Sequence, residues 1–138
     1  MSLYNITFKN KEITKLINEE MGKAYGMVSK VKLGGIGSRR MIIQEFSQDL
    51  NNLRLKVSGL QYANIELRPK GVILHINQGI YTHAWTILFY HLNIYNGDFF
   101  TIHGNGNYIQ FNKEKSWKEN RNFLQKLIQL KSNYKPLL

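Results

Sequence analysis

Hydrophobic residues before residue 52 recur at the spacing of helices. A first helix is predicted after Asn10, whose side chain suits an N-cap, and it weakens at Gly22 and Gly26. Its apolar residues are Ile13, Leu16, Ile17 and Met21. Residues 28–33 fit either a strand or the end of that helix, and a second short helix is predicted after Ser38. Its apolar residues are Ile42, Ile43, Phe46 and Leu50.

From residue 52 the pattern changes to short apolar or alternating runs separated by turn sequences. The turn sequences are Arg68-Pro69-Lys70-Gly71, Asn77-Gln78-Gly79, Asn96-Gly97 and Gly104-Asn105-Gly106-Asn107. The predicted strands cover residues 53–58, 62–67, 71–76, 80–87, 90–95, 98–103 and 107–111. Their hairpin spacing predicts a seven-stranded antiparallel meander, or partly open barrel, over residues 52–111.

The last zone, residues 112–138, has the pattern of an amphipathic helix followed by a tail that Pro136 keeps from continuing it. One face carries Trp117, Phe123, Leu124, Leu127 and Ile128. The other carries Lys115, Lys118, Arg121 and Lys126. The sequence therefore predicts one α+β domain over residues 1–138, in which a helical segment over residues 1–51 precedes the meander and the final helix.

The order of seven short antiparallel strands and an amphipathic helix with an early tryptophan resembles the pleckstrin-homology-like domains, especially the compact bacterial ones. The resemblance covers residues 52–132. It rests on Leu53–Val57, the Pro69-Lys70-Gly71 turn, Tyr108–Phe111 and the helix of Trp117. It implies a binding module, because such domains mainly bind ligands and some hold phosphoinositide headgroups. Lys56, Arg68 and Lys70 resemble the headgroup motif loosely, since the last two lie beyond the predicted second strand.

The chain of 138 residues has the size and composition of one globular domain. It contains no cysteine, which excludes disulfides, thiolate metal sites and cysteine catalysis. The first eleven residues lack the apolar stretch of a signal peptide. The most apolar region, residues 72–95, is interrupted by histidine, asparagine and glycine, so no transmembrane segment is expected. These features together predict a soluble, cytoplasmic protein.

The net charge of the chain indicates which kinds of binding partner to expect. The chain has 19 basic and 9 acidic residues, a net charge of +10. Such an excess favours an anionic membrane surface, an acidic protein or nucleic acid. The candidate anion-binding residues are Arg39, Arg40, Arg68, Lys70, Lys115, Lys118, Arg121 and Lys126. The first two follow the glycine-rich run 34–37, whose backbone N–H groups could converge on an anion.

Two alternatives use other residues. Exposed tyrosines on a basic sheet would form a platform for single-stranded nucleic acid, and Tyr81, Tyr90 and Tyr95 are predicted to reach the surface. Trp85, Phe100 and Phe111 are instead predicted to build the core. The four histidines, His75, His83, His91 and His103, all fall among the strands and raise the possibility of a metal site. They lack the spacing of a known metal motif.

No sequence motif places a nucleophile beside a base, so an enzyme is the third choice and no cofactor is expected. The leading hypothesis is a non-enzymatic binding module for an anionic membrane surface or an acidic protein. A single-stranded nucleic-acid-binding protein is the alternative.

Overall fold

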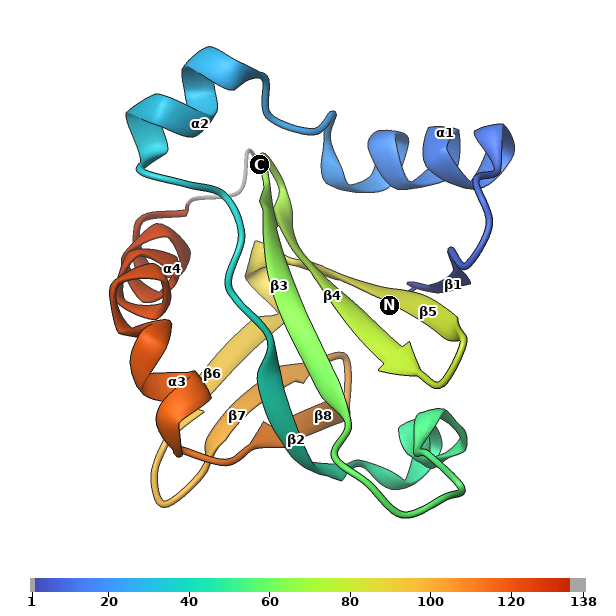
Figure 1. The fold of residues 1–138 in the computed structure, drawn as a ribbon. Helices are drawn as coiled ribbons and strands as arrows, with labels where there is room; N and C mark the ends of the chain where they lie inside the picture. The colour runs from blue at the N-terminus through green and yellow to red at the C-terminus, as the bar shows by residue number, and fades with distance from the viewer. Residues whose placement is uncertain (1, 135–138) are drawn as a thin grey trace.

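The computed structural model describes residues 2–134, and within them not the side chains of residues 115 and 116. The described residues form an α+β fold (Figure 1). The strands are β1 (Ser2–Asn5), β2 (Met41–Phe46), β3 (Tyr62–Arg68), β4 (Gly71–Gln78), β5 (Tyr81–Leu88), β6 (Leu92–Asn96), β7 (Phe100–Gly104) and β8 (Asn107–Phe111). The helices are α1 (Lys11–Met21), α2 (Met27–Leu33), α3 (Lys115–Glu119) and α4 (Arg121–Asn133), with 3-10 turns η1 (Gln48–Leu53) and η2 (Phe89–His91).

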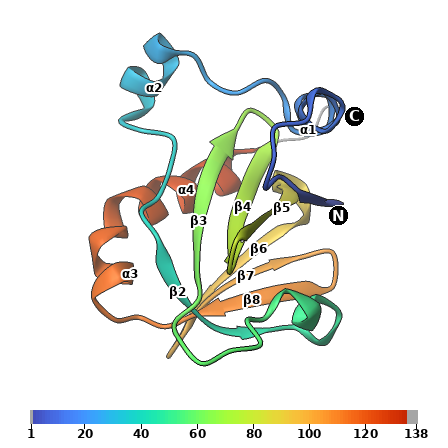
Figure 2. The ribbon, with the colours of Figure 1, turned by 45° about the vertical axis from the view of Figure 1, so that its right-hand side comes forward.

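The strands of the described chain form one antiparallel sheet in the order β1-β5-β4-β3-β2-β8-β7-β6. Strands β3–β5 are one meander and β6–β8 are another. The two are joined by β2, which pairs with β3 on one side and β8 on the other. Figures 1 and 2 show the β6–β8 half crossing behind the β3–β5 half. The α+β class and the antiparallel sheet are confirmed, but the single seven-stranded meander is wrong.

Strand β2 lies where the sequence pattern predicts a short helix. Its ladder register shifts between Ile43 and Glu45, which is a β-bulge. In a regular strand Met41 and Phe46 would point to opposite faces, but the bulge lets both be buried. The helix predicted after Ser38 is therefore wrong: its apolar residues Ile42, Ile43 and Phe46 belong to β2, and Leu50 belongs to η1. With β1 at the sheet edge beside β5, the N-terminal segment contains two strands as well as two helices.

The strand predicted over residues 53–58 is also wrong, because an irregular loop follows η1 here. The amide of Gln61 is buried and holds this loop. Its Nε2 donates to the carbonyl of Leu53 (2.6 Å), and its Oε1 accepts from the N–H of Leu55 (3.0 Å). One side chain thus satisfies backbone groups that a neighbouring strand would otherwise pair. Leu53 is buried but Val57 is exposed, so their alternation has no regular sheet behind it.

The other six predicted strands are confirmed as β3–β8 to within two residues at each end. Two of their hairpin turns, the β4–β5 turn at Gly79 (φ 61°) and the β7–β8 turn, have the positive φ that the sequence indicates. Between β7 and β8, Asn105 (φ 51°) and Gly106 (φ 82°) both adopt the left-handed conformation that a tight hairpin needs. Trp85, Phe100 and Phe111 are fully buried, as predicted.

Two apolar cores lie on opposite faces of β4, because neighbouring residues of a strand point to opposite sides. The larger core fills the bent sheet and is covered by α4. It includes Leu74, Ile76, Trp85, Phe111 and Leu127. The smaller core lies beneath α1 and contains Ile17, Met21, Ile73 and Ala84. Helix α1 begins as predicted, since the Asn10 side chain accepts from the N–H groups of Glu12 and Ile13.

The predicted C-terminal helix is divided at Asn120 into α3 and α4. The Asn120 side chain is turned to another part of the chain: its Oδ1 accepts from the N–H of Arg39 (2.7 Å) and its Nδ2 donates to the carbonyl of the same residue (3.2 Å). Trp117 of α3 packs against the larger core. The predicted stop at Pro136 lies outside the described residues, and α4 ends at Asn133.

Candidate functional site

Helix α2 is unusual because none of its residues is buried. Met27, Val28 and Val31 are 82%, 71% and 76% exposed. At 3.6 residues per turn these three side chains cover one arc of about 100°. Lys30 lies on one side of that arc and Lys32 on the other. The helix therefore presents an apolar stripe bordered by two cations, and Figure 1 shows it standing away from the sheet.

Glycines set the limits of α2. Gly26 precedes it, and Gly34 ends it in the left-handed conformation (φ 72°), with its N–H directed to the carbonyls of Lys30 and Val31. Such a glycine is the usual end of a helix because it lacks the Cβ that this conformation disfavours. The half-buried residues Ser29 and Leu33 lie on the side opposite the apolar arc.

Lys126 of α4 fixes the end of α2 to the rest of the molecule. Its ammonium donates to the carbonyl of Leu33 and to that of Gly35 (2.7 Å for the second). A cation at the carboxyl end of a helix also complements the helix dipole. Lys126, predicted to bind an anion, therefore has an internal role that places α2 against α4.

Further cations lie near the junction of α3 and α4. Asn120 holds the backbone of Arg39 beside the junction of α3 and α4, and the Arg39 side chain is 79% exposed. Lys118 and Arg121 flank that junction and are exposed. Glu119 is the acidic group nearest to Arg39, at 3.9 Å between Nη1 and Oε2. We call α2, Arg39 and Lys118 the helical face; Arg121 lines a separate pocket with Asn96, Phe100 and Gln125.

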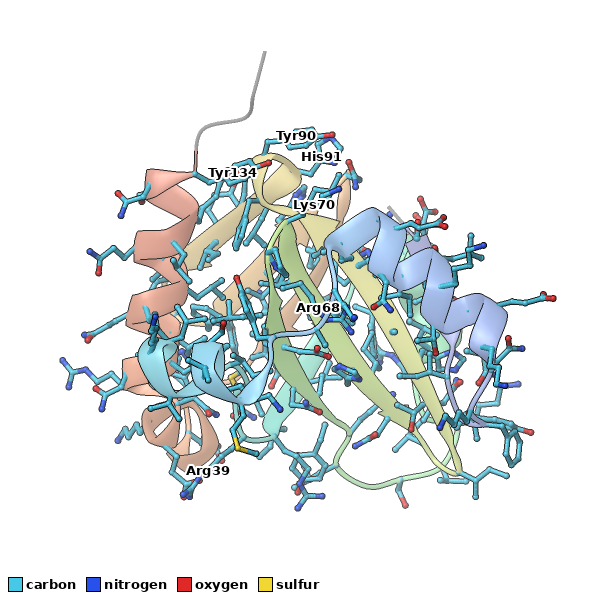
Figure 3. All side chains as sticks on the ribbon, turned by 90° about the horizontal axis from the view of Figure 1, so that it is seen from above. Arg39, Arg68, Lys70, Tyr90, His91 and Tyr134 are labelled. Atoms are coloured by element: carbon cyan, nitrogen blue, oxygen red, sulfur yellow. The ribbon has the colours of Figure 1, made fainter. Side chains whose placement is uncertain are left out.

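The structure thus brings together only part of the predicted set. Arg40 is exposed and its guanidinium lies 4.5 Å from the centre of the Tyr62 ring, a cation–π contact. Lys70 lies in the β3–β4 turn, and Figure 3 shows it near Tyr90 and His91, well apart from Arg39. The Lys115 side chain lies outside the described residues.

Arg68 is used inside the molecule. Its Nε donates to Glu66 Oε2 (2.6 Å), and its Nη1 donates to Asn18 Oδ1 (2.9 Å) and to the carbonyl of Gly22 (2.8 Å). The other Glu66 oxygen pairs with His75 Nε2 (2.8 Å). Burial raises the pKa of Glu66, but the hydrogen bonds and charges of His75 and Arg68 outweigh it and lower that pKa overall.

The histidines do not converge. The register pairs His75 with Ala84 and Ile76 with His83, so the two histidines point to opposite faces of the sheet. His83 instead pairs with Gln78, and burial lowers its pKa. Among residues 2–134, no three His, Asp or Glu side chains lie close enough together to hold a metal ion.

The three tyrosines are exposed as predicted, but from different places. Tyr81 begins β5, Tyr90 lies in η2 beyond the other end of β5, and Tyr95 is in β6 with its ring perpendicular to that of His103. This separation does not favour a continuous stacking platform for nucleic-acid bases.

The loop before β3 lies at the opposite end of the molecule from α2 (Figure 2). Val57 and Leu60 of this loop and Ile80 of the β4–β5 turn are exposed apolar side chains. The two segments are held together because Gln78 Nε2 donates to the carbonyl of Asn52 (2.7 Å). We call Val57, Leu60 and Ile80 the loop tip. Neither the apolar arc of α2 nor the loop tip is predicted from the sequence, although residues 27–32 do show an apolar spacing bordered by lysines.

Comparison of the chain with models of protein families, with curated proteins and with solved structures gives no match. In the part of the chain that is described, no helix is long and apolar enough to cross a bilayer.

Proposed function

We propose that this protein is a pleckstrin-homology-like binding module that docks on an anionic membrane surface through its helical face. The fold part of the proposal is supported by strands β2–β8, seven antiparallel strands that precede a helical segment carrying Trp117. Strand β1 and the helices α1 and α2 are then additions to that core.

The exposed apolar arc of α2 carries the docking part of the proposal. A large exposed apolar side chain is common, but three on one short helix, bordered by lysines, match the pattern of a helix lying in a membrane interface. Met27, Val28 and Val31 would enter the boundary between headgroups and acyl chains. Lys30 and Lys32 would remain level with the phosphates, since long basic side chains keep their charge in the polar layer.

The rest of the helical face supplies charge. Basic side chains near an anionic membrane contribute about 1 kcal/mol each, and this attraction decreases with salt. Partial burial of the three apolar side chains adds roughly 1 kcal/mol each. Because a single shallow anchor gives only reversible association, the binding is expected to be weak and to require both terms.

The test is flotation with phosphatidylserine-containing vesicles and with pure phosphatidylcholine vesicles at near-physiological salt. The wild-type protein should float with the anionic vesicles only. The triple variant Met27→Ser/Val28→Ser/Val31→Ser should lose roughly 3 kcal/mol of binding, about a hundredfold in partitioning. Lys30→Gln/Lys32→Gln should weaken binding to the anionic vesicles, and added salt should do the same.

The matched control is Val57→Ser/Leu60→Ser/Ile80→Ser, which removes three exposed apolar side chains from the loop tip. It should float like the wild type. If this control loses flotation while the α2 variant keeps it, the docking surface proposed here is wrong. If the wild-type protein does not float, membrane docking is wrong and an acidic protein becomes the partner to seek. Displacement by single-stranded RNA would favour nucleic-acid binding instead.

A further inference from the structure

A pocket of about 200 Å³ lies between α1 and the face of the β3–β5 meander that carries the smaller core. Figure 3 shows α1 and α2 on different sides of the molecule, so the pocket is separate from the helical face. Ile13 and Ile17 of α1 form one wall. Ile73 and Ala84 form the floor. Six of the twelve lining residues are apolar and six are polar or charged. A small molecule with an apolar body and a polar group would match this mixture.

The N-terminal arm borders the mouth of this pocket. Ile6 and Thr7 are held to β5, since the Ile6 N–H donates to the carbonyl of Thr82 (2.8 Å) and the Thr82 N–H donates to Thr7 Oγ1 (2.9 Å). The next residue, Phe8, lines the pocket yet is 80% exposed. An aromatic ring left in water beside an apolar pocket is a surface that a bound apolar group would cover.

The charges that line the pocket favour an anion. Glu66 is neutralised by Arg68 and also pairs with His75, so this wall is satisfied internally. Lys9 also lines the pocket and has no hydrogen-bond or ion-pair partner among the described residues. The site therefore combines an apolar interior with one unpaired cation at its mouth.

We propose that this pocket binds a small amphiphilic carboxylate. Its alkyl body lies against Ile13, Ile73 and Ala84 beneath the Phe8 ring, and its carboxylate pairs with Lys9 at the mouth. An apolar cavity of about 150 Å³ is large enough for benzene, so a six-carbon body suits the volume found here. Hexanoate is therefore the probe, and the full-length protein is the sample.

Binding is measured by titrating hexanoate while following methyl resonances of isoleucine and alanine by NMR. Shifts should saturate with one site and involve Ile13, Ile17, Ile73 and Ala84. Hexan-1-ol, which has the same body without the charge, should bind more weakly, by up to about fivefold, the range of an exposed ion pair. Absence of saturable shifts at these residues with hexanoate would overturn the proposal.

Matched variants locate the site. Thr14→Phe fills the pocket from its exposed edge and should abolish saturable binding. Leu16→Phe adds a ring to the same helix at an exposed position outside the pocket and should leave binding unchanged. Lys9→Gln should remove the preference for hexanoate over hexan-1-ol, whereas Lys15→Gln should keep it. Binding that survives Thr14→Phe, or a preference that survives Lys9→Gln, would contradict the assignment.

Discussion

At the scale of single residues, Glu66 shows how one carboxylate can hold a helix to a sheet. It accepts from Arg68 on one oxygen and pairs with His75 on the other. Arg68 extends the link to the side chain of Asn18 and the carbonyl of Gly22 at the end of α1. Because Glu66 is ionised and accepts only, the His75 Nε2 carries the hydrogen that it donates.

The lowered pKa of Glu66 predicts a dependence of stability on pH. A carboxyl group whose folded pKa lies below its ordinary value of 4.5 stabilises the folded state fully above that value. This contribution is lost as the pH falls through the folded pKa. Glu66→Gln should therefore destabilise the protein at pH about 7, by about 1–3 kcal/mol, and reduce the loss of stability in acid. Urea unfolding at neutral and acidic pH measures both effects, and parallel pH profiles for variant and wild type would refute the explanation.

Gly71 shows a residue whose type is explained by packing and not by turn geometry. The sequence suggests a turn glycine after Pro69 and Lys70, and the hairpin does turn there. However, Gly71 does not have a positive φ. A Cβ at this position would lie 2.0 Å from the carbonyl oxygen of Ile87, so the close approach of β4 and β5 requires the missing side chain.

At the scale of elements, the break between α3 and α4 depends on Asn120. Its amide bonds both backbone groups of Arg39 and is almost fully buried. This fixes the segment that carries Arg39 beside the helices. The position of one side chain therefore links the shape of the C-terminal helices to the arrangement of the helical face.

Asn120→Ala is expected to cost about 2 kcal/mol of stability, because it leaves the N–H and carbonyl of Arg39 without their partner. It should also weaken binding to anionic vesicles, since Arg39 is no longer held in place. Chemical denaturation and flotation measure these effects. Asn122→Ala, an exposed position on α4, is the control and should change neither. Equal stability of the two variants would argue against this role of Asn120.

The sequence predicts elements well where local pattern and local structure agree. The turns at Gly79 and at Asn105-Gly106 have the positive φ that such hairpins need, and the Asn10 cap is predicted by its side chain. The prediction fails where a residue far away in the sequence determines the local backbone structure. The bulge in β2 depends on its pairing with β8, and the loop after η1 depends on the Gln61 amide. For the site, the anion-binding roles of Arg39, Lys118 and Arg121 stay predictions, and the internal roles of Arg68 and Lys126 depend on partners far away in the chain.

At the scale of the whole molecule, the two cores differ in extent. The core within the bent sheet receives side chains from β2–β8 and α4, whereas the core under α1 contains four buried side chains, those of Ile17, Met21, Ile73 and Ala84. Besides that core, α1 is held by the Arg68 link and by Glu20, whose carboxylate accepts from Tyr4 and Thr86. Helix α1 is therefore stabilised by fewer contacts than the strands beneath it.

This difference predicts that α1 opens before the sheet unfolds. In native-state hydrogen exchange, amides of α1 should exchange through a local opening, while those of β4 and β5 exchange only on global unfolding. Met21→Ala should cost about 3 kcal/mol and increase exchange in α1 more than in β4. Leu16→Ala, at a half-exposed position of the same helix, is the control. Equal protection of α1 and β4 in the wild type would show that they unfold as one unit.

Strand β2 joins the two halves of the sheet. Residues 41–42 pair with β3 and residues 43–46 pair with β8, and the bulge lies within the second pairing, between Ile43 and Glu45. The number of residues in β2 therefore sets the register of both halves. Deleting one residue within β2 would exchange inward-facing and outward-facing side chains along part of this strand. Insertions and deletions are tolerable in the connections on either side of β2. The number of residues within β2 is fixed, because the strand pairs with both β3 and β8.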